Sequence, residues 1–66
     1  MNWISVKDKL PEDHTYSEAL LIYDYEDDYV YIGDYTKEWG FGDFENSGIK
    51  YDNITHWMYL KDIPKP

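Results

Sequence analysis

Two β-prone runs joined by acidic residues constrain the fold of this chain more than any other feature. Residues 18–25 read EALLIYDY, residues 28–36 read DYVYIGDYT, and Glu26, Asp27 and Asp28 fall at the junction. Aromatic and β-branched residues favour strands, and a short loop between two such runs is typical of a hairpin. We therefore predict an antiparallel β-hairpin over residues 18–36.

Alternation along the two runs predicts which side chains share a face, because successive residues of a strand point to opposite sides of a sheet. We expect one face to be rich in tyrosine and the other to be aliphatic and to end in carboxylates. The first face would hold Ala19, Leu21, Tyr23, Tyr25, Tyr29, Tyr31, Gly33 and Tyr35, and the second Leu20, Ile22, Asp24, Val30, Ile32 and Asp34.

The remaining segments are predicted to extend the same sheet. They comprise a short extended entry at residues 2–6, a loop at residues 7–18, a strand at residues 37–44, a turn at residues 45–48 and a last strand at residues 49–60, broken near Asp52 and Asn53. Gly40 and Gly42 suggest a bulge or a close approach of another backbone.

These segments together predict the fold class. We expect a mainly β (or α+β) protein with a small curled antiparallel sheet or partial barrel of about four or five strands. At most one short helical turn is expected, within the loop. Residues 1–66 would form a single small domain, with residues 61–66 as a loosely packed tail.

Size and composition allow a folded domain without crosslinks. The chain has 66 residues, of which 20% are aromatic and none is cysteine. A domain this short buries only about 60% of the surface that its unfolded chain exposes. Large ring side chains supply much of that buried area. Disulfides, thiolate metal sites and a cysteine nucleophile are excluded.

The charge balance favours a basic partner. Fourteen acidic residues face six lysines, arginine is absent, and the formal net charge is −8. Such a surface repels nucleic acid and anionic lipid, and it attracts cationic proteins. The alternative is that the charge only keeps a small domain soluble. Neither a signal peptide nor an apolar run of about 18 residues is present, so we expect a soluble, cytoplasmic protein.

Catalysis, metal binding and cofactors are not indicated. His14 and His56 lie outside any known catalytic spacing, and no phosphate-binding or metalloprotease motif occurs. His56 is expected at the edge of the core, bonded to a loop group. The acidic cluster lacks the glycine and the distal glutamate of a calcium-binding loop. We therefore expect neither enzymatic activity nor a metal or cofactor.

The acidic residues also suggest a surface that mimics nucleic acid. Like-facing residues recur about every 6.6 Å along a strand. Successive phosphates on one DNA strand are spaced on a similar scale, since each sits about 3.4 Å further along the helix axis than the one before. Neighbouring tyrosines would add rigid contact area. The predicted partner surface comprises Asp24, Glu26, Asp27, Asp28, Asp34, Glu38, Asp43, Tyr25, Tyr29 and Tyr31. The alternative is that these charges only blunt the hairpin edge.

The two ends of the chain carry a family resemblance. Residues 3–13 read WISVKDKLPED and residues 54–60 read ITHWMYL, followed by Pro64 and Pro66. This pattern is similar to a family of small proteins of unknown function that is common in phage and prophage genomes. The resemblance covers the whole chain and implies a phage-linked, non-membrane protein of the host cytoplasm. It implies no activity. The sequence departs from the pattern in YLKDIP and in its acidic middle.

The residues at the two ends of the chain have two physical interpretations. In the first, Trp3 and Trp57 are neighbours in the core, and Asp8 caps the following turn or accepts a bond from Thr55 or His56. In the second, Trp3, Asp8, His56 and Trp57 line a small pocket that stacks a nucleobase.

Three hypotheses about function follow. The leading one is a phage-encoded, anti-CRISPR-like interaction protein that inhibits a host nucleic-acid-binding defence effector by occupying its basic groove. The second is a non-enzymatic pocket protein that sequesters a nucleotide-like ligand. The third is a structural or accessory phage domain, with homodimerisation through an edge strand or the tyrosine face.

Overall fold

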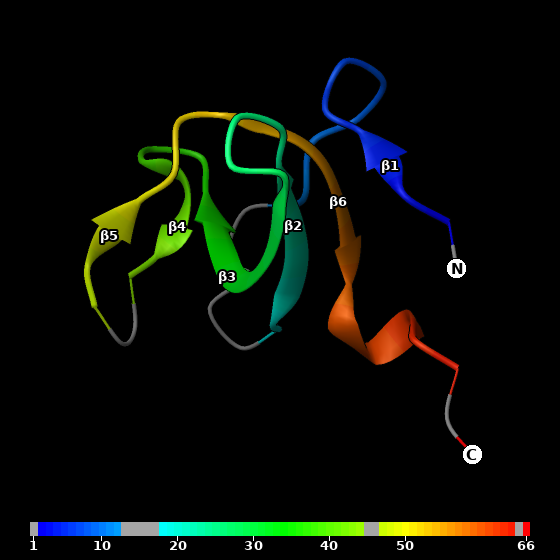
Figure 1. Ribbon diagram of the computed structural model, residues 1–66. Coiled ribbons are helices and arrows are strands. Elements are labelled where there is room, and N and C mark those ends of the chain that lie inside the picture. The colour runs from blue at the N-terminus through cyan, green and yellow to red at the C-terminus, as the bar shows by residue number, and fades with distance from the viewer. Residues whose placement is uncertain (1, 13–17, 45–46, 65) are drawn as a thin grey trace.

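The strands of the chain join into one open antiparallel sheet in which the last strand lies next to the first. The computed structural model describes residues 2–12, 18–44, 47–64 and 66. Within them the sheet has six strands in the order β1-β6-β2-β3-β4-β5 (Figure 1). The strands are β1 (Ile4–Ser5), β2 (Leu20–Asp24), β3 (Tyr29–Thr36), β4 (Gly40–Asp43), β5 (Ile49–Lys50) and β6 (Ile54–Tyr59), followed by a short 3-10 helix, η2 (Leu60–Asp62).

This arrangement confirms the predicted fold class. The sheet is antiparallel, it is not closed into a barrel, and a single 3-10 turn is the helical content of the described residues. The expected last strand is divided at residues 51–53 into β5 and β6, close to the predicted break. The sheet has six strands rather than four or five, because the two-residue segments β1 and β5 also pair. None of the described helical segments is long and apolar enough to cross a membrane.

The predicted hairpin is present, but its faces differ from the prediction. In the β2–β3 register, Ile22 pairs with Tyr31 and Tyr23 pairs with Val30. Directly paired residues lie on the same face, so Tyr23 shares a face with Val30, not with Tyr31. The cause is the loop at residues 25–28, which places Asp24 opposite Tyr29. Every even-numbered residue of β2 therefore pairs with an odd-numbered residue of β3.

One face of the sheet, here called the inner face, carries the core. Its buried members are Leu20, Ile22, Tyr35, Phe41, Ile54 and Trp57, and Ile4, Val6, Tyr31, Tyr51 and Tyr59 pack against them. Trp57 is fully buried, and the Tyr35 and Phe41 rings lie 4.9 Å apart. Burying such rings removes large apolar areas from water, which is how a short chain without crosslinks stabilises its fold.

Two glycines mark tight approaches in the half of the sheet that contains β3, β4 and β5. A Cβ atom at Gly33 would lie 2.5 Å from the carbonyl oxygen of Gly42, and one at Gly42 would meet the carbonyl of Ile49 and the ring of Phe44. The expected close approach therefore occurs at Gly42. Gly40 has a φ of +80° and serves the turn that enters β4.

The chain ends are fastened to the sheet. The indole Nε1 of Trp57 donates to the carbonyl oxygen of Lys9 at 2.8 Å, which ties the loop after β1 to the core. Close to the C-terminus, the amide of Leu60 donates to the carbonyl of Ala19, and Lys61 Nζ lies 3.2 Å from a carboxylate oxygen of Glu18. The tail is thus anchored at its start. His14 lies outside the described residues, together with the rest of residues 13–17 in the loop before β2.

Candidate functional site

Two of the predicted partner-binding carboxylates are buried. Asp24 is 5% exposed and Asp34 is 6% exposed. Asp24 Oδ1 accepts hydrogen bonds from the amides of Glu26 and Asp27, at 2.9 and 3.0 Å. The prediction that Asp24 belongs to the partner-binding array is therefore wrong. Its carboxylate is turned into the hairpin because the turn needs an acceptor for these amides. Asp34 lies 3.4 Å from the amide of Phe44 and is likewise unavailable to a partner.

The other carboxylates of the hairpin form its exposed tip, which we define as Glu26, Asp27 and Asp28. Each accepts a hydrogen bond from the rest of the chain. Asn53 Nδ2 donates to Glu26 at 2.6 Å, the Tyr31 hydroxyl to Asp27 at 3.1 Å, and the Tyr23 hydroxyl to Asp28 at 2.6 Å. The tip is thus held in place although it is exposed.

The tip does not form a straight row of charges. Tyr31 belongs to the inner face and Tyr23 to the opposite, outer face, so their bonds draw Asp27 and Asp28 to different sides of the sheet. Glu38 follows the far end of β3 and the half-buried Asp43 lies at the end of β4. Eight residues of β3 at about 3.3 Å each separate Glu38 from the tip by roughly 25 Å. The expected phosphate-like ladder is therefore wrong in its geometry.

The three tyrosines of the predicted partner surface lie beside the tip, but they differ from one another in exposure. Tyr25 and Tyr29 are 60% and 58% exposed. Tyr31 is half-buried, and its ring stacks on Tyr51 with centroids 4.5 Å apart. The pKa of Tyr31 is raised above its ordinary value, first by burial and then by the hydrogen bond to Asp27. The pKa of Tyr23 is raised chiefly by its hydrogen bond to Asp28.

A shallow groove crosses the outer face of the sheet. It is lined by Trp3, Tyr23, Val30 and His56 and has a volume of about 410 Å³. The Tyr23 ring lies 6.5 Å from Trp3 and 6.4 Å from His56, with interplanar angles of 60° and 63°. His56 pairs with both Ser5 and Tyr23 across β6, and Tyr23 pairs with Val30. His56, Tyr23 and Val30 therefore lie in one row across β6, β2 and β3, and Trp3 joins them from the segment just before β1.

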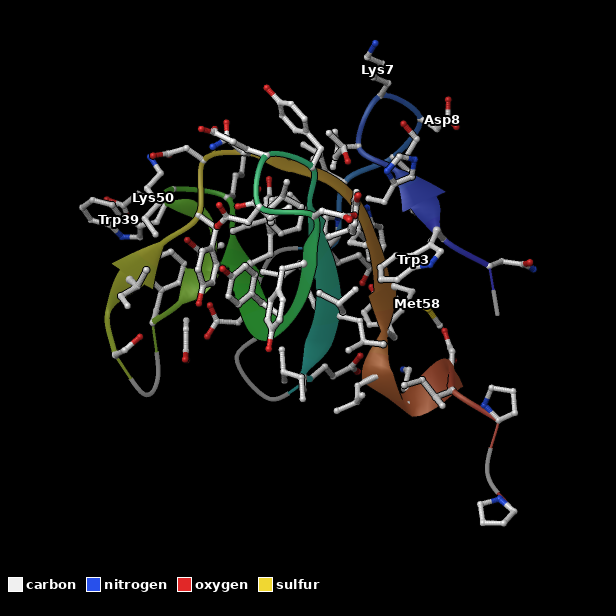
Figure 2. All side chains as sticks on the ribbon, in the orientation of Figure 1. Trp3, Lys7, Asp8, Trp39, Lys50 and Met58 are labelled. Atoms are coloured by element: carbon white, nitrogen blue, oxygen red, sulfur yellow. The ribbon has the colours of Figure 1, made fainter. Side chains whose placement is uncertain are left out.

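This groove differs from the predicted pocket of Trp3, Asp8, His56 and Trp57. His56 and Trp57 are adjacent in β6 and point to opposite faces, and Trp57 is fully buried in the core. Asp8 is exposed on the loop beyond β1, where Figure 2 shows it apart from Trp3. Trp3, at 38% exposure, is not a core neighbour of Trp57. The adjacency of His56 and Trp57 in a predicted strand could have revealed this from the sequence.

Tyr23 and Val30 are the groove residues that the sequence analysis did not assign to a pocket. The alternation in the sequence predicts opposite faces for Tyr23 and Val30, whereas the hairpin register pairs them on one face. His56 itself is half-buried, and its Nδ1 lies 2.9 Å from the Thr55 hydroxyl. The groove thus combines three rings, one aliphatic side chain and, through the Tyr23 hydroxyl, the carboxylate of Asp28.

A second hollow lies beside the far end of the sheet. Trp39, Phe44, Gly48 and Lys50 line it, with a volume of about 570 Å³. Figure 2 shows Trp39 and Lys50 close together there, away from Trp3. The Lys50 ammonium lies 3.9 Å from Asp52, and both side chains are exposed. Among the residues the structure describes, no three histidine or acidic side chains are grouped to hold a metal ion.

Comparison with protein families finds a match over almost the whole chain. The family model described as Protein of unknown function (DUF551) matches residues 2–65. No curated protein and no solved structure matches the chain.

Proposed function

The chain belongs to the DUF551 family, whose description assigns no activity, and we propose that it is an interaction protein whose hairpin tip binds a basic protein. The observation that carries this proposal is the ordered acidic tip between two exposed tyrosines. Glu26, Asp27 and Asp28 are exposed but held by hydrogen bonds, and Tyr25 and Tyr29 flank them.

Several physical features support this use of the tip. Fixed carboxylates lose little entropy when a cation approaches, and tyrosines add contact area with few rotatable bonds. The net charge of −8 speeds encounter with a cationic partner and disfavours nucleic acid itself. Because Asp27 and Asp28 turn to opposite faces, the contact surface would be a narrow acidic wedge with tyrosine rings beside its carboxylates. It would not reproduce a row of phosphates.

The finer proposal concerns the partner. A protein that binds nucleic acid presents lysine and arginine in a groove, and an acidic wedge of this kind would fill it. We propose a phage-encoded protein that inhibits a host defence effector of this class in the cytoplasm. The support for this step is the charge, the acidic tip and the resemblance of the chain ends.

Binding to an oligoarginine peptide tests the role of the tip. The variant Glu26→Gln, Asp27→Asn, Asp28→Asn changes the net charge from −8 to −5, since each substitution removes one negative charge. Asparagine suits position 28, where φ is +50°. A matched variant, Glu12→Gln, Asp52→Asn, Asp62→Asn, has the same net charge and alters exposed carboxylates elsewhere.

We expect the tip variant to lose much more affinity than its matched partner, measured by calorimetry at low and at physiological salt. Affinity of the unmodified chain should fall as salt rises, because screening acts on exposed charges. Equal losses in the two variants would show that only net charge matters, and the proposal would be abandoned.

The second candidate function is sequestration of a nucleotide-like ligand, now at the hollow beside Trp39 and Lys50. An exposed indole can stack a base, and a lysine can contact a phosphate; both line this hollow. A thermal-shift screen with nucleotides tests it, because a ligand at 100 times its Kd adds about 2.7 kcal/mol to the free energy of unfolding. An unchanged melting temperature at saturating nucleotide would remove this candidate.

A further inference from the structure

The groove on the outer face is built from tilted aromatic rings. Tyr23 lies between Trp3 and His56, and each neighbouring ring is inclined to it by about 60°, with angles of 60° and 63°. These are edge-to-face contacts, so the faces of the rings are not covered by one another. Val30, which is 42% exposed, completes the lining. A volume of about 410 Å³ lies within the range of known ligand pockets.

A negative charge stands next to these rings. The Tyr23 hydroxyl donates to Asp28 Oδ1 at 2.6 Å, and a carboxylate can accept further bonds through its other oxygen. None of the described residues that line the groove is a lysine. A ligand in the groove would therefore meet aromatic rings and one carboxylate, the combination that attracts a cation with an apolar stem.

We propose that this groove receives one arginine side chain of the basic partner, with the guanidinium against the rings of Trp3 and Tyr23 and with Asp28 as its counter-ion. Arginine fits better than lysine because its planar, weakly hydrated guanidinium stacks on aromatic faces and pairs with a carboxylate at the same time. This inference rests on the proposed function, since it assigns a specific contact to the partner of the hairpin tip.

Nuclear magnetic resonance of the ¹⁵N-labelled full chain provides the test. The chain has three tryptophans, in three different environments. Trp3 lines the groove, Trp39 lines the hollow that contains Lys50, and Trp57 is buried with its Nε1 bonded to Lys9. We expect a short glycine-flanked arginine peptide to shift the Trp3 indole signal and the amide signals of Tyr23 and Val30. The Trp39 and Trp57 indole signals should stay in place.

A peptide with citrulline in place of arginine is the matched ligand, because citrulline keeps the shape and lacks the charge. It should leave the Trp3 signal unchanged, and a lysine peptide should bind more weakly. Trp3→Ala should lower affinity for the arginine peptide about threefold, as expected for a cation–π contact at a partly exposed site. Trp39→Ala, which removes an indole of comparable exposure elsewhere, should have no effect.

Asp28→Asn provides a second test in case Trp3→Ala does not fold. It keeps all the groove rings, and asparagine tolerates the positive φ of position 28. It should weaken arginine binding while the Trp57 indole signal remains at its folded position. If the citrulline peptide binds as well as the arginine peptide, or if Trp3 does not respond, the inference is wrong. Should oligoarginine binding nevertheless depend on the hairpin tip, the proposed function would survive; should it not, both would fall.

Discussion

Asp24 is the residue whose role differs most from what its position in an acidic cluster indicates. Its carboxylate is buried and accepts two amide hydrogen bonds from the hairpin loop. Without that acceptor, the amides of Glu26 and Asp27 would lose partners in a partly buried site. Hydrogen bonds to a charged acceptor contribute about 1.5–3 kcal/mol each, so this carboxylate stabilises the fold.

Asp24→Ala should therefore lower the free energy of unfolding by about 3 kcal/mol, because two hydrogen bonds to the charged acceptor are lost. Asp24→Asn should recover part of the loss, because its amide oxygen still accepts. Urea denaturation followed by tryptophan fluorescence measures the change. Asp27→Ala is the control, since Asp27 is exposed and accepts a single bond from Tyr31. An Asp24→Ala effect no larger than that of Asp27→Ala would contradict this role.

The hydroxyls of Tyr23, Tyr31 and Tyr51 predict how stability depends on alkaline pH. Their pKa values are raised above the ordinary 10.0, in Tyr23 first by the bond to Asp28 and in the other two first by burial. Above pH 10 the folded chain keeps protons that the unfolded chain has lost. The contribution of these hydroxyls to the free energy of unfolding is therefore fully present below pH 10, and it is lost as pH rises through their raised pKa values.

Lys61 acts in the same direction, because its hydrogen bond with Glu18 raises its pKa above 10.5. Urea midpoints between neutral and strongly alkaline pH should show the fall. Tyr23→Phe and Tyr31→Phe should flatten the curve, because each removes a hydroxyl whose pKa is raised in the folded chain. A midpoint that stays constant across this range would refute the linkage.

Single residues also show where inference from the sequence stops. Tyr25, Tyr29 and the tip carboxylates were placed on the surface correctly from a charged loop between two apolar runs. The burial of Asp24 was not predictable from composition, because it depends on which amides the loop leaves without partners. His56 and Trp57 were grouped in one pocket although neighbours in a strand face opposite sides.

At the scale of elements, the hairpin was predictable and its register was not. Alternating apolar residues define the two strands, but loop length decides which residues face each other, and several loop lengths fit the same pattern. The register observed separates Tyr23 from Tyr31 and so creates the groove on the outer face. The edge strands β1 and β5 have two residues each, which limits pairing with another chain. Homodimerisation remains a hypothesis.

Gly33 shows how closely β3 approaches β4. A methyl group there would lie 2.5 Å from the Gly42 carbonyl oxygen and 3.0 Å from Ile22 Cδ1. We expect Gly33→Ala to destabilise the chain by about 1–3 kcal/mol, as overpacking does. Gly40→Ala is the comparison, since its added methyl meets nothing within 4 Å but retains a φ of +80°. It should cost about 1 kcal/mol through backbone strain alone.

Thermal and urea unfolding of both glycine variants separate the two effects. Lengthening or shifting β4 could relieve the clash at Gly33, and cross-strand amide contacts between Asp34 and Gly42 would then change in nuclear magnetic resonance spectra. A Gly33→Ala variant as stable as the unmodified chain, with these contacts intact, would show that the sheet is not closely packed there.

At the scale of the whole molecule, the net negative charge is expected to oppose folding and to favour the proposed binding of a basic partner. The chain measures 32 × 26 × 21 Å and carries a net charge of −8. A Debye length of about 30 Å at 0.01 M salt spans the molecule, and about 8 Å at 0.15 M does not. Carboxylates on distant elements therefore repel one another at low salt, and this repulsion weakens the compact state.

Added sodium chloride should consequently raise the free energy of unfolding while it lowers affinity for an oligoarginine peptide. The matched variant Glu12→Gln, Asp52→Asn, Asp62→Asn should gain less stability from salt, because its net charge is smaller. Urea unfolding and calorimetry over the same salt series measure both quantities. If salt instead lowered stability, exposed ion pairs such as Lys61–Glu18 would outweigh the general repulsion. The acidic surface would then stabilise the fold, and its charge would no longer support the proposal that it binds a basic partner.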